Sequence, residues 1–342
     1  MLSYEQSVQV LQLLYPSETQ MQILAFGILG GLDIGQQSHL LRSKPLKLIL
    51  HTERTSWEHF SSYTQIQHKY IDLTEDWDAQ WIAKLLVTAP NVFLVGATDV
   101  WSIQTVSEIS SGDRNLWIAH NVAGDTWTDA DFSSIFSTMD LHNGQILIIG
   151  DIKDISLKEI LKLALSEHCA YFSNSTGVES KVQNWLNHIR RPSLRKSWPM
   201  LLSERKKYFW MAVQMFSQIY QPQDVAHREK YIQFLRHASE KIGIPELREI
   251  AVRFHTSMEL WQLLGACLLD DESVVLQGIA KHSREILQGE TDSMLRAFLL
   301  ENQPIDVDAR LQLLADSVER ILYCEQQAFR DISVVLQQKS YA

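Results

Sequence analysis

Cysteine is scarce in this 342-residue chain, and the three that occur, Cys169, Cys267 and Cys324, lie far apart in the sequence. A metal knuckle needs closely spaced cysteines and a disulfide framework needs a denser, even-numbered set, so neither is expected. Sparse thiols are typical of a reducing compartment, and the sequence therefore predicts a cytoplasmic protein. For Cys169 we expect a buried position, because a free cysteine behaves as a small apolar side chain.

Long apolar runs and an excess of positive charge are also missing. No stretch reaches the roughly 18 uninterrupted apolar residues of a membrane span, and the N-terminus lacks the basic start of a secretion signal. Lys and Arg number 31 against 41 Asp and Glu, which gives a formal net charge of −10. Nucleic-acid-binding proteins need a basic face. We therefore expect neither a membrane nor a nucleic acid as a partner.

Glycine motifs that hold phosphate groups are absent as well. Gly27, Gly30 and Gly31 have neither the spacing of a P-loop nor that of a dinucleotide-binding loop. The sequence Gly-x-Ser-x-Gly, which surrounds the nucleophile of α/β-hydrolases, does not occur either. No cofactor is expected.

The first half of the chain mixes strand and helix patterns. Short apolar runs bounded by turn residues predict buried strands, at 46–50, 91–96, 115–120 and 145–150. Asn143-Gly144 is a turn signal and predicts that the last of these pairs with the segment before it. Helical spacing of apolar residues predicts helices between them, at 3–15, 19–29, 76–86 and 157–165. Ser156 and Glu159 have the spacing of a capping box for the last helix.

The second half has helical periodicity only. The expected helices lie near 202–219, 225–241, 245–256, 257–268, 271–287 and 306–337. The segment 189–199 combines two prolines with four cations and is typical of an exposed connector. The sequence thus predicts a mixed α/β (α+β) domain over residues 1–177 followed by an all-α domain over 178–342.

His120 is the most suggestive single residue, because it ends a predicted strand, where rigid scaffolds present catalytic side chains. Asp151 follows the next strong strand and would fix the histidine tautomer if the two strands were neighbours. The alternative is that His120 bonds a loop carbonyl and that Asp151 caps a turn. The residues alone favour this second interpretation.

A metal site would draw on acidic and histidine side chains that lie close together in the sequence. These are His120, Asp125, Asp129, Asp131, Asp140 and His142. Their spacing matches no carboxylate loop and no His-x-x-x-His pair, and acidic loop residues are most often solvated. No metal is expected.

The order of features resembles the butirosin-biosynthesis protein H family, which joins a papain-like N-terminal domain to a helical C-terminal domain. In the N-terminal half the resemblance rests on segments 17–32, 91–101, 115–124 and 145–165. In the C-terminal half it rests on segments 228–238, 258–261 and 314–329. It implies a papain-like α/β (α+β) domain followed by an all-α helical domain.

The resemblance also implies acyl transfer, in which an acyl group passes from a carrier-protein thioester through a cysteine to an amine. His120 and Asp151 fall at the places of the supporting histidine and aspartate, and Ser3 is closest to the place of the cysteine. Asp99 and Trp101 lie in segment 91–101, which resembles a strand of the family, and we expect them to bind the substrate or partner.

Three functions remain open at this point. The first is a non-catalytic relative that binds an acyl chain, an acyl carrier protein or a partner enzyme, and the second is an active serine-variant acyltransferase or hydrolase. The third is a helical interaction protein, and formation of a homo-oligomer is also left open. Carrier proteins are generally acidic, so the basic segment would attract one through Arg190, Arg191, Arg195 and Lys196, together with Arg205, Lys206 and Lys207.

Overall fold

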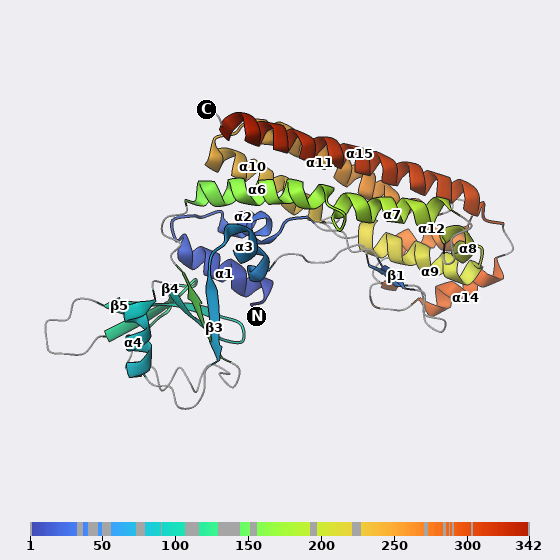
Figure 1. The fold of residues 1–342 in the computed structure, drawn as a ribbon. Coiled ribbons are helices and arrows are strands. Elements are labelled where there is room, and N and C mark those ends of the chain that lie inside the picture. Colours follow the sequence, from blue (N-terminus) through green and yellow to red (C-terminus); the bar gives the residue numbers. More distant parts are fainter. Residues whose placement is uncertain are drawn as a thin grey trace. The chain divides into compact units, whose positions relative to one another are not determined.

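The computed structural model of the chain is a mixed α and β protein with two compact units (Figure 1). It describes residues 2–32, 37–39, 47–49, 56–72, 79–89, 91–106, 116–128, 144–150, 156–191, 197–220, 227–269, 273–282, 285–286, 288, 291–301 and 304–340. Unit 1 comprises Met1–Gly31 and Arg54–Ala164, and unit 2 comprises Leu32–Glu53 and Leu165–Ala342. By contacts between residues, the second unit thus resumes at Leu165.

Unit 1 contains a six-stranded antiparallel sheet with the strand order β3-β8-β4-β5-β6-β7. The strands are β3 (His68–Asp72), β4 (Asn91–Val95), β5 (Val100–Val106), β6 (Leu116–Asn121), β7 (Thr126–Thr128) and β8 (Gln145–Ile149). Both sides of β8 are occupied, by β3 and by β4. The expected pairing of β8 with the segment before it is therefore wrong.

Alternation along the strands divides the sheet residues between its two faces. On one face Leu94, Trp101 and Ile146 pack with Ile82 of α4 (Ala79–Thr88) in one apolar cluster. On the other face the neighbouring residues Phe93 and Leu147 are also buried. Burial on both faces explains why β4 and β8 have almost continuous apolar sequences.

The remaining helices of unit 1 are α1 (Tyr4–Leu14), α2 (Met21–Leu29), α3 (Trp57–Thr64) and the first part of α6 (Leu157–Ser173). α1 packs against α2 and contacts β5. The expected capping box of α6 is confirmed: Glu159 N donates to Ser156 Oγ at 3.2 Å, and Ser156 N donates to Glu159 Oε2 at 2.9 Å.

Unit 2 is largely helical. Its helices beyond α6 are α7 (Val178–Arg190), α8 (Trp198–Leu202), α9 (Arg205–Met215), η3 (Phe216–Tyr220), α10 (Arg228–Ile242), α11 (Glu246–Ala266), α12 (Val274–Lys281), α14 (Asp292–Leu300) and α15 (Val307–Ser340). The long helix α15 runs beside α11 (Figure 1). The separate helices expected at 245–256 and 257–268 form the single helix α11.

Unit 2 is not purely helical, because it also includes the short antiparallel pair β1 (Gln37–His39) and β2 (Lys47–Ile49). β2 contacts α9. The strand expected at 46–50 thus exists, but it joins the helical unit rather than the large sheet.

A buried ion pair lies in the core of unit 2. Arg228 of α10 and Glu325 of α15 are at most 1% exposed, and the guanidinium binds the carboxylate through Nε at 2.9 Å and Nη2 at 2.8 Å. Ser257 Oγ and Trp261 Nε1, both on α11, donate to Glu325 Oε1 at 2.5 and 3.3 Å. One carboxylate therefore links three helices, and its oxygen lone pairs have donors, which a buried charge requires.

Candidate functional site

Ser3, the expected nucleophile position, is the N-cap of α1. Its hydroxyl accepts a hydrogen bond from Gln6 N at 3.1 Å, and Gln6 Oε1 accepts one from Ser3 N at 2.8 Å. Ser7, one turn later, donates its hydroxyl hydrogen to the Ser3 carbonyl at 2.9 Å. Within the described residues, neither hydroxyl is hydrogen-bonded to His120. The local geometry gives Ser3 a role in starting the helix.

His120 lies on β6 between two hydroxyl-bearing residues of the neighbouring strands. Its Nδ1 is 3.1 Å from Thr126 Oγ1 on β7, and Ser102 of β5 is directly opposite it in the sheet register. The structure thus places a hydroxyl beside the imidazole, which the sequence did not predict.

Asp151 lies outside the described residues. The expected contact between Asp151 and His120 required neighbouring strands, but β4 and β5 lie between β8 and β6. Three strand spacings correspond to about 14 Å. This condition for the contact is therefore not met.

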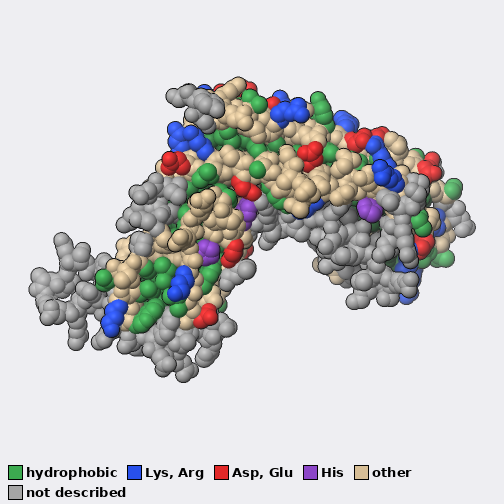
Figure 2. Space-filling model, viewed as in Figure 1, with side chains coloured by type: hydrophobic (Ala, Val, Ile, Leu, Met, Phe, Trp, Pro, Cys, Tyr) green, Lys and Arg blue, Asp and Glu red, His purple; other side chains and the backbone are tan. Residues whose placement is uncertain are grey.

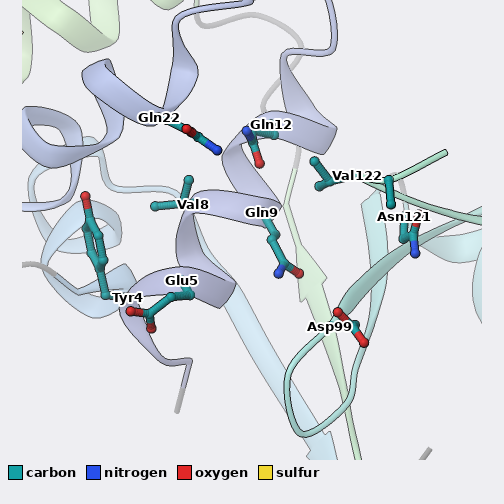
Figure 3. A pocket seen from close by; sticks show the side chains of 10 residues that line it. Tyr4, Glu5, Val8, Gln9, Gln12, Gln22, Asp99, Asn121 and Val122 are labelled. Atoms are coloured by element: carbon teal, nitrogen blue, oxygen red, sulfur yellow. The ribbon is translucent and has the colours of Figure 1, made fainter.

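A cavity of about 520 Å³ lies beside α1 in unit 1 (Figure 3). α1 contributes half of its lining, and α2, the turn between β4 and β5, and the end of β6 contribute the rest. The lining residues are Tyr4, Glu5, Val8, Gln9, Gln12, Gln22, Asp99, Asn121, Val122 and Ala123. This volume is in the range of small-molecule sites.

Hydrogen bonds from α1 hold one wall of the cavity in place. Gln6 Nε2 donates to the carbonyls of Gly96 and Ala97 at 2.8 and 3.3 Å. Gln9 Oε1 accepts from Val100 N at 2.7 Å, and Figure 3 shows this side chain extending toward the turn that carries Asp99. Because these contacts join backbone groups of the β4–β5 turn to the helix, the cavity wall is formed before any ligand binds.

The cavity lining is rich in oxygen acceptors and contains no Lys or Arg among the described lining residues. Glu5 and Asp99 supply carboxylates, and four further side chains, Gln9, Gln12, Gln22 and Asn121, supply amides. In the described part of the chain, no protein group is hydrogen-bonded to the side chains of Glu5, Gln12 or Gln22. Such a lining attracts ligands that donate hydrogen bonds and carry positive charge.

Of the two residues expected to bind substrate or partner, only Asp99 is at the cavity. It is exposed, and its Oδ2 accepts a hydrogen bond from Thr98 Oγ1 at 3.2 Å. Trp101 is 4% exposed and packs in the apolar cluster below α4. Trp101 is therefore a core residue of the sheet.

The basic segment is only partly described, since Arg195 and Lys196 lie outside the described residues. Arg190 forms ion pairs with Glu319 and, at 3.5 Å, with Asp316 of α15. Arg205 donates to the Phe298 carbonyl at 2.8 Å, whereas Arg191 and Lys206 are exposed. On the face seen in Figure 2, acidic and basic side chains alternate along the helical unit. Two of the predicted docking cations, Arg190 and Arg205, are therefore bound within the chain.

The other sequence candidates have no common site in the described residues. Of the six side chains considered for a metal, only His120 and Asp125 are described, and the described part of the chain holds no cluster of three or more ligands.

Burial raises the pKa of Cys169 to about 11, and its thiol donates to the Phe329 carbonyl at 3.4 Å. Cys169 is partly buried, so the expectation of a buried position is met only in part. No helix among the described residues is long and apolar enough to cross a membrane.

Sequence reasoning missed Glu5, Gln9 and Gln12 as site residues. They recur at intervals of three to four residues on α1, so they share a helix face, and this regular polar stripe was the available signal. What the stripe faces depends on the fold, because Asp99 and Asn121 come from distant segments.

Comparison with known proteins gives no match: no protein-family model and no curated protein matches this chain.

Proposed function

We propose that this chain is a non-catalytic, accessory member of an acyl-transfer system of specialised metabolism, and that the cavity beside α1 binds a small ligand. The observation that carries the proposal concerns Ser3. At the place where the resemblance puts a cysteine nucleophile, the serine oxygen accepts the hydrogen bond that caps α1. An alcohol without an activating base is a weak nucleophile. A papain-like fold of the N-terminal unit and binding to an acyl carrier protein or partner enzyme belong to the same proposal.

The lining of the cavity favours a polar ligand with a protonated amine. Glu5 and Asp99 offer carboxylates to such a group, and the amide oxygens of Gln12 and Gln22 can accept further hydrogen bonds from it. An anionic ligand would have no cation among the described lining residues and would face two carboxylates, so like-charge repulsion disfavours it.

Three four-carbon probes of equal length test the ligand class by calorimetry: 1,4-diaminobutane, 1,4-butanediol and succinate. We expect the diamine to bind most tightly and succinate not to bind. Asp99→Asn should weaken diamine binding by about tenfold, the loss expected for one charge-assisted hydrogen bond. Glu18→Gln, a change outside the cavity lining, is the matched control. Equal binding of succinate and the diamine would refute this ligand class.

Incubation with short-chain acyl thioesters tests the absence of covalent chemistry. We expect mass spectrometry to find no acyl group on Ser3, and Ser3→Ala to lower stability by about 1 kcal/mol through loss of the cap. An adduct on Ser3 that disappears in His120→Ala would show that the serine-variant enzyme is the correct alternative.

A second candidate function rests on the contact between His120 and Thr126. In this alternative Thr126 Oγ attacks the thioester carbonyl, the imidazole takes the hydroxyl proton, and the proton passes to the departing thiolate. The products are a threonine ester and a free thiol. The 3.1 Å distance is within the range that general-base catalysis needs. The same incubation distinguishes it, because the adduct would lie on Thr126 and be absent in Thr126→Val.

A further inference from the structure

Gln6 makes more hydrogen bonds than a capping residue needs. Its Oε1 accepts from Ser3 N at 2.8 Å, which completes the capping box of α1. Its Nε2 donates to Gly96 O at 2.8 Å and to Ala97 O at 3.3 Å, in a turn some ninety residues away along the chain. The side chain is 7% exposed and is absent from the cavity lining. Gln6 therefore joins the start of the helix to the cavity wall without reaching the cavity itself.

The turn that Gln6 holds is the one that presents Asp99. Gly96 N donates to Asp99 O at 2.9 Å, so the turn is closed at its base, and Gln6 binds the carbonyls on its first two residues. On the helix side, Glu5 precedes Gln6 directly. The Gln6 carboxamide, together with that of Gln9, therefore holds one carboxylate in position relative to the other.

We propose that Gln6 is a positioning residue that sets the separation of Glu5 and Asp99 and thereby the affinity of the cavity for a diamine. This inference rests on the proposed function, because it concerns the same cavity. The carboxamide is suited to the task, since it has both an acceptor for Ser3 N and donors for the two carbonyls. The corresponding carboxylate would have acceptors only.

Gln6→Glu separates positioning from charge, because the two effects have opposite signs. The added negative charge by itself attracts a diamine, whereas loss of the donors to Gly96 and Ala97 releases the turn. We expect diaminobutane affinity at pH 8 to fall by about tenfold, the effect of losing the hydrogen bond to the carbonyl of the buried Gly96 and the longer one to Ala97. Gln12→Glu is the charge variant for comparison: it adds the same charge on the same helix, within the cavity lining and without loss of a bond to the turn, and should bind the diamine more tightly.

The pH profile provides a readout that general loss of stability would not give. Burial beside two carbonyl oxygens should raise the pKa of the carboxyl introduced by Gln6→Glu, and once protonated it can again donate to a carbonyl, so the affinity of this variant should recover toward the wild type as the pH falls from 8 to 5.5. Gln6→Met, which is uncharged and has no donor, should bind weakly at both pH values. Circular dichroism melting curves identify variants that have lost the fold. If Gln6→Glu is unfolded, the affinity of Gln6→Met decides the question.

Each result of the comparison has a defined meaning. Weaker binding by Gln6→Glu and Gln6→Met, with tighter binding by Gln12→Glu, supports the positioning role. Wild-type affinity in a folded Gln6→Met overturns that role while the ligand class stands. Absence of diaminobutane binding by the wild-type protein refutes the proposed ligand and this inference with it.

Discussion

At the scale of single residues, the histidine and the serine chosen from the sequence have specific local partners. His120 stands on a strand as expected, but its partner is a threonine of the next strand, and Ser3 caps a helix. The sequence predicts such residues through their positions at the ends of elements. It does not predict their partners, because strand order decides which segments are adjacent, and the order places β7 beside β6.

The buried ion pair yields a prediction at the same scale. Arg228→Met should lower the free energy of unfolding by about 3–5 kcal/mol, because it leaves the Glu325 carboxylate buried without its countercharge. Adding Glu325→Gln should recover part of this loss, since the amide oxygen still accepts from Ser257 and Trp261 but carries no charge. Urea denaturation followed by helical circular dichroism measures both.

An exposed ion pair provides the control for this experiment. Arg190 is 40% exposed, so Arg190→Met should cost less than about 1 kcal/mol. If Arg228→Met proved no more costly than Arg190→Met, the buried pair would have no special role in stability.

At the scale of helices and strands, apolar runs were the reliable signal. β4, β6 and β8 lie where the sequence predicts strands, since each has an apolar run bounded by turn residues. β3 was missed because its sequence, His-Lys-Tyr-Ile-Asp, suits the edge of a sheet and has no such run. A short apolar strand carries no information on its partner, so the sequence does not predict that β2 contacts α9 of unit 2.

Gly177 gives a prediction for the junction of α6 and α7. Its backbone is extended, a conformation open to any residue, but a Cβ there would lie 1.7 Å from the Tyr171 carbonyl oxygen. Because that neighbour is backbone, Gly177→Ala should destabilise unit 2 by at least about 2 kcal/mol. Gly278→Ala is the control: it lies in α12 with its nearest neighbour at 3.8 Å and should stabilise by about 0.5–1 kcal/mol. Thermal melts in which both substitutions had equal effects would contradict the close approach at Gly177.

At the scale of the whole molecule, alkaline pH should destabilise both units, because buried thiols and phenols keep their protons in the folded state. In unit 2, burial raises the pKa of Cys169 from 9.0 to about 11, so the folded state retains a proton that the unfolded state releases. The contribution of Cys169 to the free energy of unfolding is then fully present below pH 9 and is lost as the pH rises toward 11. In unit 1, burial raises the pKa of Tyr15 from 10.0 to about 12, which places the corresponding loss between pH 10 and 12.

Conservative substitutions show which residue causes each loss of stability. Cys169→Ser removes the titrating thiol and should flatten the decline between pH 9 and 11, and Tyr15→Phe should do the same between pH 10 and 12. Melting temperatures measured by circular dichroism at each pH provide the test. An unchanged pH dependence in both variants would show that other groups govern alkaline unfolding.

The place of β8 in the sheet has a consequence for how the chain is made. β8 is the last strand of the sheet in sequence, yet it lies between β3 and β4 and contributes hydrogen bonds to both. On the ribosome, β3 and β4 therefore emerge well before the strand that joins them, and β4 exposes an unpaired apolar edge during that interval. Such edges pair readily with other chains, and distant pairings form slowly. Synthesis of this protein should consequently depend on chaperones that shield nascent chains until residue 149 has left the exit tunnel.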